Sequence, residues 1–151
     1  MRRARIVMVL AVVVAGMILG LAGPASASVP APLRVEGQVS LPDGSGTFAA
    51  IGPVCPAGAI ETLRDQGVAG ESGRHFEVLV VHRFSCADGS GTFDLLLQVH
   101  LDFVPDYSDE FTWSVLDGTG AWAQLHGYGT GFGIRTDSGV YDTYEGSVHV
   151  D

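Results

Sequence analysis

The chain has 151 residues, with eight Lys plus Arg against 17 Asp plus Glu and a formal net charge of −9. All eight basic residues are arginines, which excludes Schiff-base chemistry and any phosphate-binding loop that depends on lysine. A surface this acidic repels phosphate backbones, so no nucleic-acid partner is expected.

The first 27 residues have the layout of a secretory signal peptide. Arg2, Arg3 and Arg5 precede an almost unbroken apolar run over residues 6–22, and residues 24–27 (Pro-Ala-Ser-Ala) supply a helix breaker and an A-x-A cleavage site. The run is shorter than the roughly 20 residues that span a bilayer. We predict cleavage after Ala27, secretion to the cell envelope or medium, and no stable membrane anchor afterwards; an uncleaved anchor is the alternative.

Residues 28–151 are expected to form a single domain, in which five arginines face all 17 acidic residues, a net charge of about −12. Period-two alternation is much commoner there than helical periodicity. The segment 59–66 is expected to make one or two helical turns, followed by a glycine-rich loop up to Gly73. Strands are expected at 34–41, 46–51, 74–84, 91–103, 111–116, 121–128, 131–136 and 140–150.

The clearest strand covers 91–103, where Phe93, Leu95 and Leu97 share one face and mostly polar residues share the other. The segment 74–84 places His82 on its more apolar face. Two interpretations of His82 are open. It is either a core histidine satisfied by a neighbouring polar group, or one of few polar groups aimed at a ligand in an apolar cavity.

Short Asp-Gly motifs separate the strands, and residues 43–48 recur letter for letter at 88–93. Asp-Gly between alternating segments predicts hairpin turns of type I′, which need positive φ at both central residues. A calcium loop is the alternative, but each motif has a single acid. Glycines inside the expected strands favour a barrel over a sandwich, because barrel strands coil sharply. They are Gly127, Gly129, Gly131, Gly133 and Gly146.

Cys55 and Cys86 are the only cysteines, and an even count in an exported chain predicts a disulfide between them. A thiol ligand or nucleophile is the alternative. The five histidines are scattered without the i, i+2 spacing that aims two side chains to one face of a strand. We therefore expect no metal and no cofactor.

The stretch 113–131 resembles a recurring element of the allene oxide cyclase and dirigent-like β-barrels. It has a strand, the turn Gly118-Thr119-Gly120, an aromatic residue (Trp122) two positions on, and a small-residue strand ending in Gly-x-Gly. Residues 140–150 are similar to the closing strand of that family. The resemblance implies an all-β fold, an antiparallel barrel of about eight strands with an apolar cavity. Bacterial members include exported proteins and some cyclases.

The sequence lacks a recognisable catalytic set, which favours a binding protein over an enzyme. Our first hypothesis is a secreted barrel that binds a small apolar ligand or a surface partner. The alternatives are a cyclase or isomerase that uses a shaped cavity, with His82 and Tyr144 as its polar groups, and an envelope interaction protein with an acidic exterior. The candidate ligand-binding residues are His82, Trp113, Trp122 and Tyr144, the two tryptophans having barrel core as their other interpretation.

Overall fold

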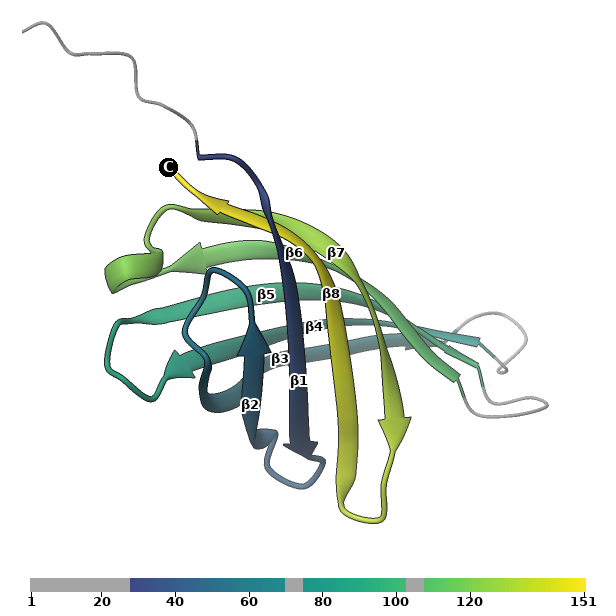
Figure 1. Ribbon diagram of the computed structural model, residues 1–151. Coiled ribbons are helices and arrows are strands. Elements are labelled where there is room, and N and C mark those ends of the chain that lie inside the picture. Colours follow the sequence, from purple (N-terminus) through teal and green to yellow (C-terminus); the bar gives the residue numbers. More distant parts are fainter. Residues whose placement is uncertain (1–27, 70–74, 103–107) are drawn as a thin grey trace, which may run out of the picture.

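The computed structural model describes residues 28–69, 75–102 and 108–151, which form a closed barrel of antiparallel strands (Figure 1). Each strand pairs with the next along the chain, and the last pairs with the first. The strands are β1 (Ala31–Ser40), β2 (Ser45–Ile51), β3 (Ala57–Ala69), β4 (His75–Cys86), β5 (Thr92–Asp102), β6 (Ser108–Gly118), β7 (Leu125–Arg135) and β8 (Gly139–Val150). The predicted all-β barrel is confirmed. The predicted signal peptide lies outside the described residues.

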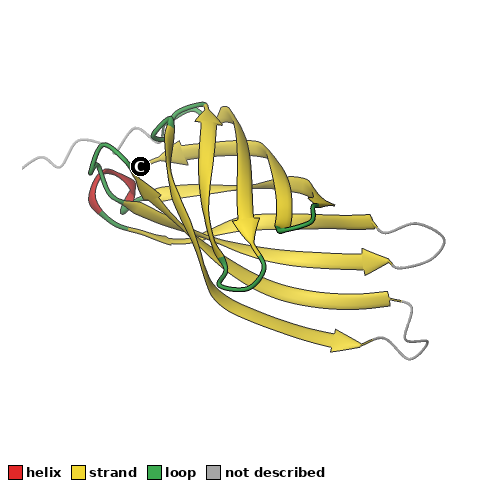
Figure 2. Cartoon of the chain, turned by 90° about the horizontal axis from the view of Figure 1, so that it is seen from below, coloured by secondary structure: helices red, strands yellow, loops and turns green. Residues whose placement is uncertain are grey.

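The two ends of the barrel are built differently. At one, which we call the disulfide end, the Cys55–Cys86 bond joins the loop after β2 to the end of β4, confirming the predicted pairing. A 3-10 helix, η1 (Gly120–Trp122), lies at this end beside the C-terminus (Figure 2). At the other, the open end, β3 to β6 extend to one side while β1, β2, β7 and β8 bend away from them (Figure 1). The described residues contain no helix long and apolar enough to cross a membrane.

Strand β5 shows how alternation fills the barrel. Phe93 and Leu95 are fully buried on its inner face, whereas Gln98 and His100 are exposed on the outer face. Successive side chains of a strand point to opposite faces, so one apolar phase supplies a whole inner wall. The predicted orientation of this strand is confirmed, and the same phase on β4 turns His82 inward.

Aromatic rings fill the barrel towards the disulfide end. Phe84 and Phe93 stack with their centroids 4.9 Å apart, and Phe48 meets Phe84 edge-on at 5.2 Å. Tyr144 packs edge-on against Phe84 at 5.6 Å, and its ring is tilted against that of Phe111 at 5.0 Å. Offset and edge-on ring pairs of this kind stabilise a core beyond the area they bury. Tyr144 therefore links the rings near the disulfide end to Phe111, which lines the cavity described below.

Glycines on the inner face of β7 make room for the rings of β6. A Cβ added at Gly129 would lie 2.7 Å from the indole of Trp113, and one at Gly131 would lie 2.2 Å from the ring of Phe111. Gly146, which pairs with Gly129, would meet the same indole at 2.5 Å. These glycines, predicted to ease the bending of strands, are required because bulky neighbouring side chains occupy the space of their missing Cβ atoms.

Three local predictions were wrong. Residues 59–66 belong to strand β3, not to a helix, and residues 121–128 and 131–136 are not two strands but η1 followed by the single strand β7. The turns are not type I′, because no described residue other than glycine has positive φ. Instead Gly44 (φ 67°) and Gly89 (φ 75°) each follow an Asp that accepts a hydrogen bond from the backbone N–H of Ser45 or Ser90. In the second turn Gly91 (φ 146°) also has positive φ.

Candidate functional site

A cavity of about 420 Å³ opens at the open end of the barrel. Its walls are mostly the apolar inner faces of β4, β5 and β6, and its rim is formed by the β1–β2 turn and by part of β3. The apolar wall residues include Val78, Val80, Leu97, Val99, Leu101 and Phe111. Three buried polar side chains, His82, Asp109 and Asp142, also line it. The cavity therefore combines an apolar wall with a small cluster of polar side chains.

His82 reaches the cavity from β4. Its side chain is 6% exposed, and its Nδ1 lies 2.8 Å from the hydroxyl oxygen of Tyr144. Among the described residues, Nε2 of the same ring has no hydrogen-bond partner, and the residue lines the cavity. Burial lowers the pKa of His82 from 6.5 to about 4, because the charged imidazolium would lose its water. The ring is therefore neutral at physiological pH.

Asp142 enters the same cluster from β8. It is 5% exposed, and the Tyr144 hydroxyl donates to its Oδ2 over 3.4 Å, a long hydrogen bond. Burial, followed by the nearby charge of Asp109, raises the pKa of Asp142 to about 7, against a lowering by the Tyr144 hydroxyl. A buried carboxyl that ionises near neutral pH is typical of acid–base sites, although it also occurs in structural pairs.

Asp109 faces Asp142 across the glycine strand β7. A Cβ added at Gly133 would lie 2.6 Å from Oδ2 of Asp109 and 2.9 Å from Oδ1 of Asp142. The missing side chain thus lets carboxyl groups from β6 and β8 approach the same point. A side chain at this position would separate them.

Tyr144 lies in the core beneath these groups and does not itself line the cavity. It is fully buried, and its hydroxyl lies between His82 and Asp142. Burial, and then the charge of Asp142, raise its pKa well above the ordinary value, so the phenol keeps its proton. A phenol with one proton and two neighbours that can each accept it is a bridge between them.

Neither family models nor curated proteins nor solved structures gave a match to this chain. The resemblance to allene oxide cyclase and dirigent-like barrels therefore stays a prediction. The function proposed below is therefore inferred from the geometry of the cavity.

The structure brings together two of the four residues that the sequence singled out. His82 lines the cavity, and Tyr144, which is fully buried and does not line it, meets His82 from the core beneath. Trp113 does not line the cavity: its indole N–H donates to the carbonyl oxygen of Thr130, 3.0 Å away, within the core. The core interpretation of Trp113 therefore holds.

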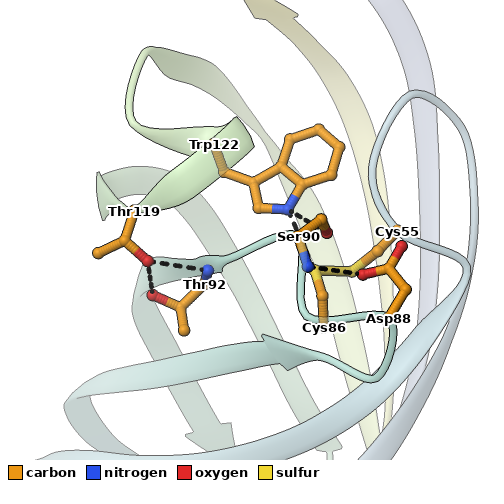
Figure 3. Close-up of a disulfide and its surroundings, with 7 residues drawn as sticks. All are labelled: Cys55, Cys86, Asp88, Ser90, Thr92, Thr119 and Trp122. Carbon is orange, nitrogen blue, oxygen red and sulfur yellow. Dashed lines mark hydrogen bonds between the residues drawn. A yellow bond between two sulfur atoms is a disulfide. The ribbon is translucent and has the colours of Figure 1, made fainter.

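Trp122 lies at the opposite end, over the disulfide (Figure 3). Its indole N–H points to Sγ of Cys86 at 3.1 Å and to Oγ of Ser90 at 3.3 Å. Nearby, Oγ1 of Thr119 accepts from the backbone N–H of Thr92, tying the loop after β6 to the start of β5 (Figure 3). These contacts close the disulfide end, and Trp122 is not a lining residue of the cavity.

Sequence reasoning missed Asp109 and Asp142. The signal was present, since Asp142 shares its strand phase with Tyr144 and Val148, and Asp109 shares its phase with Phe111 and Trp113. A carboxylate in an apolar phase indicates a buried polar site. In the described part of the chain, no group of three His, Cys, Asp or Glu side chains could hold a metal ion.

Proposed function

We propose that the protein binds a small, mostly apolar molecule in the open-end cavity, with a polar group of that molecule against His82 and Asp142. One observation carries this proposal: an apolar-walled cavity of about 420 Å³ whose buried polar side chains gather in one cluster. Ligand sites commonly have volumes of roughly 300–1,000 Å³ and orient an apolar body with a few placed polar groups.

The proposed setting is outside the cytoplasm. Residues 1–27 have the pattern of a signal peptide, and the Cys55–Cys86 bond fits an oxidising compartment. A secreted barrel with this cavity would carry or sequester a poorly soluble molecule.

The test compares two tryptophan variants of β4, one whose new side chain fills the cavity and one whose new side chain lies outside it. Val80 lines the cavity, whereas its neighbour Leu79 lies on the outer face and is 43% exposed. Val80→Trp should abolish binding of a neutral fluorescent lipophile such as N-phenyl-1-naphthylamine, and Leu79→Trp should bind it as the parent does. Native mass spectrometry of protein purified from its own host should show a bound mass that Val80→Trp lacks. Absence of binding by the parent, or equal binding by both variants, would refute the proposal.

A second candidate function is a cyclase or isomerase, and the cluster at the floor favours it. A carboxyl with a pKa of about 7 beside a neutral imidazole can exchange protons with a bound substrate near neutral pH. A panel of β,γ-unsaturated cyclic ketones, followed by the ultraviolet absorbance of the conjugated product, would detect such turnover. His82→Gln should then abolish turnover in a protein that remains folded; a loss of stability in this variant without any turnover in the parent would support a core role.

A further inference from the structure

The floor of the cavity presents one ring nitrogen whose hydrogen-bonding character is not fixed by the protein. Nδ1 of His82 is engaged by Tyr144, Nε2 has no hydrogen-bond partner among the described residues, and the residue lines the cavity. A neutral imidazole has one protonated nitrogen, a donor, and one bare nitrogen, an acceptor. Whichever role Nδ1 takes towards Tyr144, Nε2 takes the other towards a ligand.

The role of Nδ1 depends in turn on where Tyr144 sends its single proton. The hydroxyl lies 2.8 Å from Nδ1 of His82 and 3.4 Å from Oδ2 of Asp142. When Asp142 is neutral, the shorter contact is favoured, and Tyr144 donates to a bare Nδ1. When Asp142 is ionised, donation to the carboxylate becomes favourable, because hydrogen bonds to a charged acceptor are roughly twice as strong as neutral ones.

We propose that His82, Tyr144 and Asp142 form a proton relay that reverses what the cavity floor offers to a ligand. With Asp142 ionised, His82 carries its proton on Nδ1 and presents bare Nε2 as an acceptor for hydroxyl ligands. With Asp142 neutral, His82 carries its proton on Nε2 and presents a donor for carbonyl ligands. This inference rests on the proposed binding function and names the ligand chemistry of the same site.

The protons balance across the two states. Uptake of one proton at Nε2 from the cavity moves the Nδ1 proton to the Tyr144 oxygen, and the former Tyr144 proton moves to Oδ2 of Asp142. The ring is neutral in both end states. Burial supports this, since the pKa of His82 is lowered to about 4 while that of Asp142 is raised to about 7.

The groups that face Asp142 set the pH at which the reversal occurs. β6 brings Asp109, whose charge raises the pKa of Asp142, and β8 itself brings Tyr144, which lowers it. The strands paired on either side contribute glycines opposite Asp142, Gly133 from β7 and Gly37 from β1. β4 contributes neutral His82. Within residues 28–69, 75–102 and 108–151, the other charged side chains that line the cavity are Asp43, Arg64 and Asp65, at the rim.

Nitrogen-15 NMR of the histidine rings tests the relay without any ligand, because the shifts of Nδ1 and Nε2 distinguish the two neutral tautomers from each other and from imidazolium. The His82 signals are identified by their loss in His82→Gln. Between pH 5.5 and 8.5 we expect His82 to pass from the Nε2–H to the Nδ1–H tautomer, with a midpoint near pH 7. A single tautomer across this range, or conversion to imidazolium, would overturn the proposal.

Two variants separate the relay from a general effect of pH. Tyr144→Phe removes the bridging proton, so the His82 tautomer should no longer follow Asp142. Asp109→Asn keeps the bridge but removes the neighbouring charge, so the midpoint should move to lower pH while the exchange of tautomers persists. If Tyr144→Phe does not fold, Asp109→Asn alone decides: an unmoved midpoint would contradict the relay.

A matched pair of ligands tests the consequence for binding. The probes are 2-acetylnaphthalene, a ketone, and 1-(2-naphthyl)ethanol, the corresponding alcohol. Between pH 5.5 and 8.5 the Kd of the ketone, which can only accept, should rise by roughly two- to tenfold, the worth of one hydrogen bond, whereas the Kd of the alcohol, whose hydroxyl can accept or donate, should change by less. If both bind with the same pH dependence, the relay is refuted and binding stands. If neither probe nor the lipophile above binds at any pH, the proposed function fails instead.

Discussion

His82 and Tyr144 lie on strands that are four apart in a barrel of eight, and their side chains nevertheless meet at 2.8 Å between Nδ1 and the hydroxyl oxygen. β4 and β8 are therefore joined across the interior by a polar contact between residues 62 positions apart in sequence. Both side chains are buried, and Tyr144 is the partner of Nδ1 of His82, whereas the Tyr144 hydroxyl also lies within 3.4 Å of Oδ2 of Asp142.

Removal of the Tyr144 hydroxyl should destabilise the protein. Tyr144→Phe keeps the ring packed against Phe84 and Phe111 but leaves Nδ1 of buried His82 without its partner. We expect a loss of about 1–3 kcal/mol in the free energy of unfolding, measured by urea denaturation at pH 7.

Tyr141→Phe is the matched control on the same strand. Its hydroxyl donates to Oε2 of Glu36 on the outer side of the barrel, in contact with water. This variant should change the free energy of unfolding by less than about 0.5 kcal/mol. If both variants lose the same free energy of unfolding, the hydrogen bond between Tyr144 and His82 does not stabilise the protein more than an exposed one does.

The pH dependence of stability should reveal two opposed contributions. The pKa of Asp142 is raised from 3.8 to about 7, so its contribution is present at low pH and is lost as the pH rises through 7. The pKa of His82 is lowered from 6.5 to about 4, so its contribution is present above pH 6.5 and is lost as the pH falls through 4. Between about pH 4 and 6.5 the two slopes, each about 1.4 kcal/mol per pH unit, cancel.

Single variants should unmask each slope. Relative to the parent, Asp142→Asn should lose stability on acidification from pH 6.5 to 4, because only the His82 slope remains. His82→Gln should instead lose stability as the pH rises from 4 to 7. Denaturant titrations at half-unit pH intervals measure both, and parallel curves for the two variants would contradict the assignment.

The glycines of β7 should not tolerate alanine. In Gly129→Ala the new Cβ would fall 2.0 Å from the carbonyl oxygen of Glu145 as well as against Trp113. Backbone has to move in response, and we expect a loss above about 2 kcal/mol by thermal or urea unfolding. Gly67→Ala on β3 is the control, because its Cβ would meet only Cγ2 of Val78 at an ordinary 3.6 Å. That variant should be neutral or slightly stabilised; similar losses in both would disprove the packing explanation.

Loss of the disulfide should lower stability while sparing the cavity. Cys55 and Cys86 are 31 residues apart, and closing such a loop stabilises by about 3–4 kcal/mol in the chain-entropy model. The double variant Cys55→Ala/Cys86→Ala should unfold at correspondingly lower urea. Because the bond lies at the end opposite the cavity, the affinity for N-phenyl-1-naphthylamine should be kept at 10 °C; loss of binding by a folded double variant would contradict this separation.

The sequence predicted the number of strands for a partly wrong reason. β3 was missed because a register shift between Thr62 and Arg64 interrupts its period-two pattern, and because residues 59–66 contain good helix formers. β7 was expected as two strands because its glycines hide the alternation of a single one. The two errors cancelled in the count. The remaining strands were found because their inner faces are continuous apolar phases.

Part of the candidate site could also be predicted from the sequence. The period-two pattern of its strand predicted that His82 points inward. Tyr144 was also expected inside the barrel, which made it a candidate partner of His82. The depth of a residue along the barrel could not be predicted, because it depends on the register between distant strands. Trp113 and Trp122 were therefore grouped with His82, although one lies in the core and the other on the disulfide.

The ladder of glycines along β7 also determines how the interior could change in size. The rings of Phe111 and Trp113 on β6 occupy the space that the glycines of β7 leave vacant, so on this side of the barrel the space inside depends on the size of those rings. Phe111 lines the cavity and lies beside Gly131. Replacing it with a residue that has a smaller side chain would extend the cavity towards Trp113 without a change in the main chain. One substitution on β6 would therefore allow the cavity to hold larger ligands.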